Sequence, residues 1–177
     1  MGMVLICSMA CSWVAVKIEQ GKRQREAVNV FRRFPGIITY DYQHHGQPGP
    51  ANRPWSCRLL GDDLAANIDF VCLGCDKRFT DDTLAHVESL PRLRVLRIGG
   101  AAVTDCGLRR LKTLTRLEYL SLARTKVTDS GLDCLAEMPS LHEVNLHGSG
   151  VTLDGVKKLR KALPNCKVSW EPPKADK

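Results

Sequence analysis

A pattern of leucine and valine positions recurs every 24 residues through the second half of the chain. Residues 117–132 read LEYLSLARTKVTDSGL. The same pattern occurs 24 positions earlier, as LRVLRIGGAAVTDCGL at 93–108, and 24 positions later, as LHEVNLHGSGVTLDGV at 141–156. A fixed period of this size is typical of stacked supersecondary units, each of which buries its apolar side against its neighbours. The chain is therefore expected to build a solenoid of repeats.

Each repeat combines the spacing of a strand with the spacing of a helix. Leu120 and Leu122 are two residues apart, as on one face of a strand. Leu132 and Leu135 are three apart, as on one side of a helix. Between them, the Thr-Asp pair at 128–129 offers side-chain oxygens to the N-terminus of that helix. The sequence thus predicts an α/β fold, a short right-handed horseshoe with parallel strands on its concave face and short helices on its convex face.

The chain divides by composition into four segments. We expect a membrane anchor at 1–17, a basic helix and an α/β N-terminal cap at 18–67, about four repeats at 68–170, and a polar tail at 171–177. A cap is expected because the first repeat of a solenoid would otherwise expose an apolar edge.

Local patterns predict the elements at the two ends of the stack. They are a basic helix at 17–34, a strand at 36–42 that pairs with the edge of the repeat sheet, a loop at 43–54, a short helix at 55–67, and a last strand around Val168.

Residues 3–16 form an uncharged, mostly apolar run that is followed by a basic cluster. The net charge is +7, and the basic excess is densest in the first 35 residues. Because Trp13 and the basic cluster suit a membrane interface, we expect a single-pass membrane protein whose repeats stay cytoplasmic. The run is shorter than the ~20 residues that span a bilayer comfortably, so an uncleaved signal and a buried first helix of a cytoplasmic protein are the alternatives.

The third repeat resembles a family of bacterial leucine-rich-repeat proteins built on the pattern LxxLxLxxTxVTDxGLxxL. The matching positions are Leu117, Leu120, Leu122, Thr125, Val127, Thr128, Asp129, Gly131, Leu132 and Leu135. QREAV at 24–28 and RLLGDD at 58–63 resemble the N-terminal region of such proteins. Members often carry one N-terminal membrane segment, so the resemblance implies the anchor as well as the fold. The repeats are also similar to those of eukaryotic F-box-associated adaptors, although the sequence shows no F-box segment.

The residues that could support metal or acid–base chemistry lack the companions that such sites need. Cys72 and Cys75 form the only CxxC pair, whereas a structural zinc site needs four ligands. Adjacent carboxylates such as those at 62–63 diverge on a helix and suit its first turn. His147 and Glu143 lie on alternate strand positions, but no nucleophile or oxyanion-hole motif accompanies them. We therefore expect free cysteines, no metal, no cofactor and no enzyme activity.

Nucleic acid and small molecules are also not expected as partners. Arg109, Arg110, Lys112 and Arg116 form a basic patch, but its predicted place is the helical side, where basic clusters are usually solvated. Only 6% of the residues are aromatic, so stacking platforms for single-stranded nucleic acid are scarce.

The strand positions that face away from the core are the remaining candidates for a binding site. They are Phe70, Cys72, Val95, Arg97, Tyr119, Ser121, Glu143 and Asn145. The set combines aromatic residues, an arginine and hydrogen-bonding groups, as protein-binding faces do. Solenoids also present extended concave surfaces to partners. We expect a module that binds another protein. The alternatives are a structural repeat protein without a dedicated ligand and an adaptor-like repeat domain similar to F-box-associated repeats.

Overall fold

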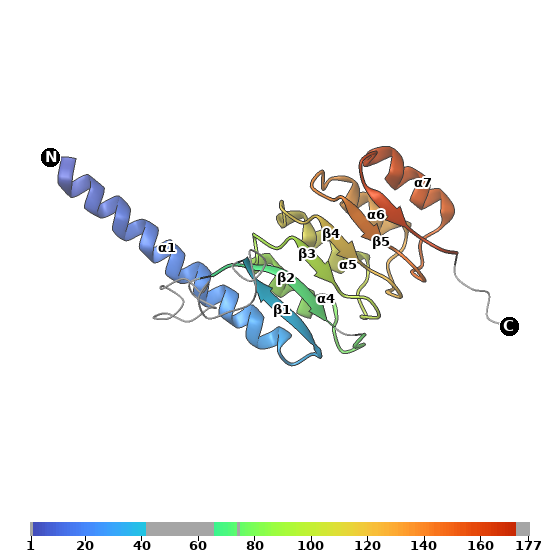
Figure 1. The fold of residues 1–177 in the computed structure, drawn as a ribbon, viewed down its shortest axis with the longest axis horizontal. Helices are drawn as coiled ribbons and strands as arrows, with labels where there is room; N and C mark the ends of the chain where they lie inside the picture. Colours follow the sequence, from blue (N-terminus) through green and yellow to red (C-terminus); the bar gives the residue numbers. More distant parts are fainter. Residues whose placement is uncertain (1, 42–65, 74, 173–177) are drawn as a thin grey trace.

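The strands form one six-stranded sheet in which neighbours in space follow the order of the sequence (Figure 1). The computed structural model describes residues 2–41, 66–73 and 75–172, with side chains from residue 15 onward. The strands are β1 (Gly36–Tyr40), β2 (Ile68–Leu73), β3 (Val95–Arg97), β4 (Tyr119–Ser121), β5 (Glu143–Asn145) and β6 (Lys167–Ser169). β1 runs antiparallel to β2, and the strands from β2 to β6 run parallel to one another.

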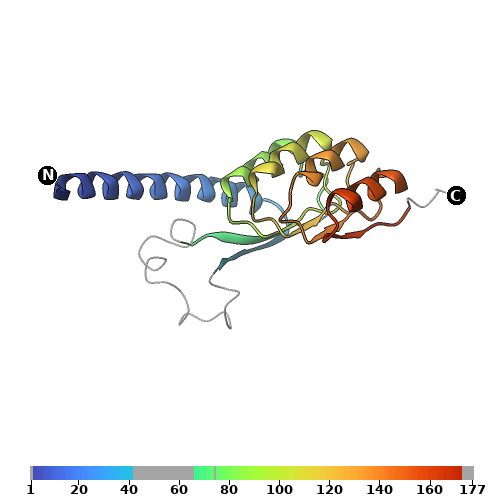
Figure 2. The same ribbon diagram turned by 90° about the horizontal axis from the view of Figure 1, so that it is seen from above.

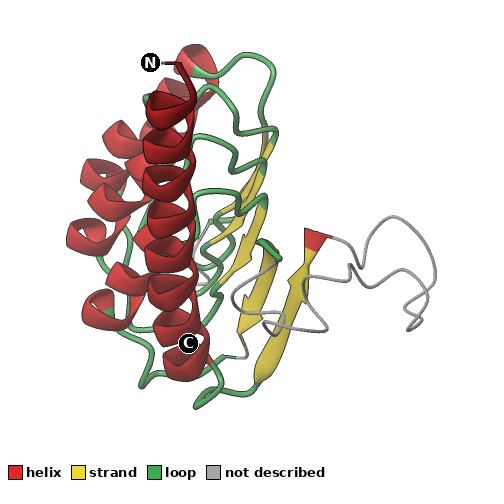
Figure 3. Cartoon of the chain, turned by 90° about the vertical axis from the view of Figure 1, so that its left-hand side faces the viewer, coloured by secondary structure: helices red, strands yellow, loops and turns green. Residues whose placement is uncertain are grey.

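The helical segments named next lie on one side of this sheet (Figures 2 and 3). They are α1 (Gly2–Phe31), α4 (Asp81–Leu84), η3 (Ala85–Ser89), α5 (Asp105–Leu108), η4 (Arg109–Thr113), α6 (Asp129–Ala136) and α7 (Leu153–Ala162), where η marks a 3₁₀ helix. Each repeat is therefore a strand followed by a helical segment, and the predicted α/β architecture with a parallel sheet is confirmed.

The core lies between the sheet and the helical layer and consists of the residues that recur with the period. Leu96, Leu120 and Val144 occupy the middle of consecutive strands, and each has no exposed surface. Leu111 and Leu135 contribute equally buried side chains from the helical layer. Full burial of one such side chain contributes about 1.5–3 kcal/mol, so the period in the sequence records the packing of the stack.

β1 and the C-terminal part of α1 cover the first repeat. The ring centroids of Phe31 and Phe34 lie 6.1 and 5.3 Å from that of Phe79, which follows β2. Strand pairing of 36–42 with the sheet edge is confirmed for Gly36–Tyr40, and the last strand around Val168 is confirmed as β6. The basic helix ends at Phe31 rather than at residue 34, because turn bonds such as Phe34 N–H to the Phe31 carbonyl (3.0 Å) replace the helical pattern before Pro35.

α1 is one continuous helix that runs through the predicted boundary between residues 17 and 18. At about 1.5 Å per residue it is roughly 45 Å long, and its N-terminal part projects away from the repeats (Figure 1). Within the described residues, no helix is both long and apolar enough to cross a membrane. The membrane anchor predicted at 3–16 is thus not supported: the described side chains of α1 include charged residues from Lys17 onward, and those of residues 2–14 lie outside the description.

Three further predictions fall on residues that the structure does not describe. They are the loop at 43–54, the short helix at 55–67 apart from its last two residues, and the tail beyond Pro172. The two described residues of that predicted helix, Ala66 and Asn67, are not helical, and they hold the sheet edge to its neighbours. The Ala66 carbonyl accepts a hydrogen bond from Gln24 Nε2 of α1 (2.7 Å), and Asn67 Nδ2 donates one to Asp41 Oδ2 (2.9 Å).

A ladder of hydrogen bonds between Asp and Thr side chains joins successive repeats. Its links run from Asp81 to Thr104, from Asp105 to Thr128 and from Asp129 to Thr152. In each link the carboxylate accepts both the backbone N–H of the Thr (2.8 Å) and its hydroxyl (2.5–2.6 Å). The sequence predicts helix capping for these Thr-Asp pairs. Of the Thr-Asp pairs only Thr104 caps its helix with its side chain, and Thr80 and Thr128 do not; Thr152, which is followed by Leu153, also caps. Each Asp of the ladder bonds the Thr of the following repeat instead.

The ladder explains why a glycine stands two residues after Asp105 and two residues after Asp129. A Cβ at Gly131 would collide with Asp105 Oδ1, which reaches across from the preceding repeat. Gly107 and Gly155 stand in the same relation to Asp81 and Asp129. The first repeat has Thr83 at the glycine position, and the last has the half-exposed Leu153 at the Asp position. The ladder therefore begins at Asp81 and ends at Thr152.

Candidate functional site on the exposed sheet face

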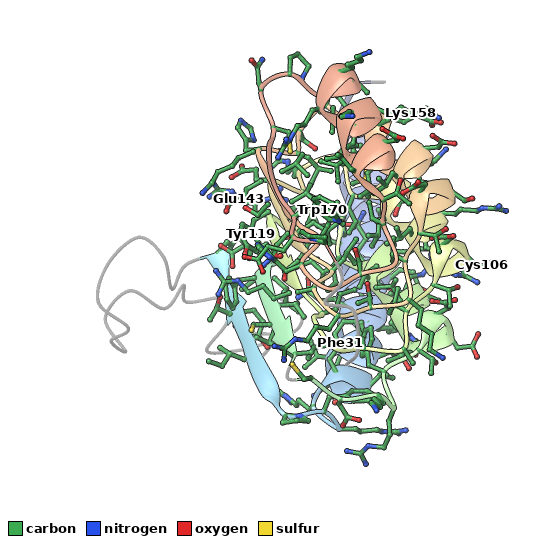
Figure 4. All side chains as sticks on the ribbon, turned by 90° about the vertical axis from the view of Figure 1, so that its right-hand side faces the viewer. Phe31, Cys106, Tyr119, Glu143, Lys158 and Trp170 are labelled. Carbon is green, nitrogen blue, oxygen red and sulfur yellow. The ribbon has the colours of Figure 1, made fainter. Side chains whose placement is uncertain are left out.

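Two rows of side chains cross the strands on the side away from the helices, and we name them together the exposed sheet face. The first row is Thr39, Phe70, Val95, Tyr119, Glu143 and Lys167, and the second is Ile37, Cys72, Arg97, Ser121, Asn145 and Ser169. Neighbours in a row are register partners on adjacent strands. Figure 4 shows Tyr119 and Glu143 on the strand side of the molecule, with Cys106 and Lys158 on the helical side.

All eight sequence-predicted binding residues lie in these two rows, although their role in binding stays a prediction. Arg97 is exposed and most of the others are half-buried, but Ser121 is only 8% exposed. Ser121 is short and lies between Arg97 and Asn145, so it offers little surface to a partner.

Four residues at the two edges of the face were not predicted as binding residues: Ile37 and Thr39 on β1, and Lys167 and Ser169 on β6. A signal for them was present, because each alternates with an inward residue such as Ile38 or Val168. Ile37 is the most exposed large apolar side chain among those described, at 62%.

Arg97 is held against two aromatic rings in the first half of the face. The guanidinium carbon lies 4.8 Å from the ring centroid of Tyr119 on β4 and 5.9 Å from that of Phe70 on β2. Such cation–π contacts contribute about 0.5–1 kcal/mol each at exposed sites. They hold a long, flexible side chain in one place.

The second half of the face is polar, and its charged groups are paired. Lys167 Nζ lies 3.4 Å from Glu143 Oε1. Asn145 Oδ1 accepts the backbone N–H of His147 (3.0 Å), and His147 Nδ1 lies 3.6 Å from Glu171 Oε2. Glu143 is therefore engaged by Lys167, while His147 faces Glu171, so the described contacts do not join Glu143 and His147 in an acid–base pair.

A column of polar residues borders the face at the start of the strands. Arg94 forms a two-point ion pair with Glu118 of the next repeat, at 2.9 and 2.8 Å. This hydrogen-bonded pair lowers the pKa of the Glu118 carboxyl, partial burial opposes the shift, and His142 one repeat further adds a smaller lowering effect. The three side chains line a shallow hollow together with Thr115, Arg116 and Ser140.

The predicted basic patch lies on the helical side, as expected from its place in the repeat. Arg110 Nη1 lies 3.1 Å from Glu88, and Lys112 Nζ lies 2.7 Å from Glu137. The hydrogen bond to Glu137 raises the pKa of Lys112. Ion pairs to the repeats on either side thus balance part of the patch, which makes it a poor docking surface for a polyanion.

The thiols and carboxylates of the described residues do not gather into a metal site. Cys72 and Cys75 are free thiols, and no group of three or more His, Cys, Asp or Glu in this part of the chain is placed to hold a metal ion. Burial raises the pKa of the Cys166 thiol, which keeps it in its unreactive protonated form. Asp62, Asp63 and the other candidate ligands in 42–65 lie outside the described residues.

No protein-family description matches the sequence, and no curated protein does. Similar solved structures include a leucine-rich-repeat protein of Leptospira interrogans (18% identity, TM-score 0.36), leiomodin-1 actin-binding site 2 (14%, 0.45) and an internalin from Listeria monocytogenes (16%, 0.33). The matches cover 48%, 58% and 51% of this chain and 27%, 69% and 33% of those chains. This chain thus spans a third or less of the Leptospira and Listeria proteins. Likeness at this level says nothing about a ligand or partner.

Proposed function

We propose that this chain is a protein-binding leucine-rich-repeat module whose partner docks on the exposed sheet face. The proposal is based on one observation: residue type recurs from strand to strand on the buried face of the sheet but not on the exposed face. The buried face repeats aliphatic residues, as at Leu96, Leu120 and Val144, whereas their neighbours Val95, Tyr119 and Glu143 change character from strand to strand. Packing of the stack requires the first set. A surface that recognises something accounts for the second.

The size of the face supports a modest interface. Six strands spaced about 4.8 Å apart give a width of roughly 24 Å. Two rows of side chains across that width cover a smaller area than the ~800 Å² that each partner contributes to a standard interface. We therefore expect the border residues Arg94, Glu118 and His142 to contribute to the interface as well.

The proposal is tested by comparing partner capture between two double variants of the whole chain. Arg97→Ala with Tyr119→Ala removes the centre of the exposed sheet face, because both side chains lie there in mutual contact. Arg109→Ala with Lys158→Ala removes two exposed cations from the helical side and serves as the matched control. We expect the first variant to lose, and the second to retain, the proteins that co-purify with the wild type by quantitative mass spectrometry.

The alternative, a structural repeat protein without a dedicated ligand, makes the opposite prediction. Co-purifying proteins would then be unaffected by the exposed-face variant, or equally affected by both variants. Either result would count against the proposal.

A further inference from the structure

We propose that the exposed sheet face recognises an acidic, partly apolar peptide segment of its partner, with one carboxylate bound by Arg97. The inference rests on the proposed function and names the chemistry of the partner at that same site. It follows from the position of the Arg97 guanidinium, from its unused donors and from the charge balance of the face.

The guanidinium of Arg97 is fixed between two rings before any partner arrives. β2 and β4 lie on either side of β3, so their residues Phe70 and Tyr119 are two strand spacings, about 9.6 Å, apart. Distances of 5.9 and 4.8 Å from the guanidinium carbon to the two ring centroids place the group between them. A partner therefore loses little side-chain entropy of Arg97 on binding.

No described residue accepts a hydrogen bond from the Arg97 guanidinium in this position. A guanidinium carries five N–H groups that match a carboxylate in a two-point fork. Across the described residues, Arg97 makes no ion pair or hydrogen bond to an acidic side chain. Arg94, by contrast, donates two hydrogen bonds to the Glu118 carboxylate. The contacts with Phe70 and Tyr119 are made through the rings, and no hydrogen bond joins either residue to the guanidinium among the described contacts.

The charge balance of the face favours an acidic partner. Glu143 is paired with Lys167, so Arg97 carries the uncompensated charge of the two described rows. A single such cation is too little for nucleic acid, whose binding needs several phosphate contacts. Phe70 and Val95 close to Arg97 are apolar, and so is Ile37, which lies in the same row two strands away and is 62% exposed. A peptide with an Asp or Glu beside an aliphatic side chain complements this arrangement.

A display library of random 12-residue peptides is the probe that tests the inference. The whole chain, its Arg97→Glu variant and an Arg109→Glu control from the exposed helical side are used for parallel selections. Arg97→Gln serves as a second variant and keeps the test valid if charge reversal disturbs the fold. Circular dichroism confirms that each protein is folded, and individual peptides are then titrated at low and high salt against these proteins and a Tyr119→Ala variant.

We expect the wild type and the Arg109→Glu control to enrich Asp or Glu next to an aliphatic residue. The Arg97→Glu variant is expected to enrich Lys or Arg at that place, and Arg97→Gln to bind the wild-type peptides about tenfold more weakly. Higher salt should weaken the wild-type complexes.

Failure of this inference can be distinguished from failure of the proposed function. Peptides that lose binding on Tyr119→Ala substitution but show no acidic preference would overturn the inference and leave the proposed function standing. Peptides whose binding survives every substitution on the exposed sheet face would overturn both.

Discussion

The residues that recur with the 24-residue period and the residues that change from repeat to repeat belong to two different regions of this molecule. Recurring residues fill the space between sheet and helices, as Leu96, Leu120 and Val144 do, or link repeats through the Asp–Thr ladder. Changing residues cover the exposed sheet face, where Val95, Tyr119 and Glu143 stand in one row. Recurrence, rather than polarity, therefore marks a residue that supports the stack.

The largest expected difference is between two adjacent residues of β4 that face opposite ways. Leu120→Ala leaves a cavity in the core and should lower the free energy of unfolding by about 2–5 kcal/mol. Tyr119→Ala removes a half-buried side chain from the exposed sheet face and should cost less than about 1 kcal/mol. Urea unfolding followed by circular dichroism measures both. Equal losses would show that the two faces do not divide stability from recognition.

A polar residue that recurs should also matter for stability. Asp105→Ala deletes the acceptor of two hydrogen bonds from Thr128 and should cost about 1–2 kcal/mol. Leu153→Ala is the matched control, because Leu153 stands at the same position of the last repeat and is 49% exposed. Its substitution should change the free energy of unfolding by less than about 0.5 kcal/mol. A loss at Leu153 as large as that at Asp105 would contradict a structural role for the ladder.

In the turn after each of β3, β4 and β5, one equivalent position has a positive φ angle, and it holds glycine in two repeats but arginine in the third. Gly100 and Gly148 adopt positive φ angles of 77° and 66°, and Arg124 occupies the equivalent place with φ 57°. Because this conformation strains a side chain, Arg124→Gly should stabilise the protein by about 0.5–1 kcal/mol. The change should appear as a melting temperature about 1–4 °C higher. The converse substitution Gly148→Ala should lower it, and a lower value for Arg124→Gly would refute the strain.

A charged residue that does not recur should have the smallest effect. Arg94 holds the pKa of Glu118 below its unfolded value of 4.5, so the pair stabilises the fold fully above that pH and is lost as the pH falls through the folded pKa. Both side chains are over one-third exposed, so Glu118→Gln should cost about 0.5 kcal/mol or less at pH 7. Unfolding curves of wild type and variant should converge well below pH 4.5. A difference that persists there would assign the effect to something other than this ion pair.

The sequence predicts the parts of the fold that depend on the period alone. Leu120 inward and Tyr119 outward follow from strand alternation, and the register of neighbouring strands follows from the 24-residue spacing. Ile37 and Thr39 were missed because β1 is antiparallel and lies outside the period. The contact of Arg97 with two rings depends on its side-chain conformation, which spacing does not determine.

The ladder was missed for a related reason. The Thr-Asp pattern indicates a helix start correctly, but it does not reveal which donors the carboxylate meets. Those donors belong to a residue 23 positions later, and only the stacking of two repeats brings them within 2.8 Å.

The two ends of the ladder make its interior extensible. A second copy of residues 105–128 placed after Thr128 would carry its own Asp, its own glycine and its own receiving Thr, and every link would remain satisfied. A copy of the last repeat, which begins at Leu153, would instead place a leucine at an Asp position inside the ladder and remove one Asp–Thr link. Duplication of the coding sequence of an interior repeat can thus lengthen this protein by one strand at a time. Each new strand adds two outward-facing residues on which selection can act.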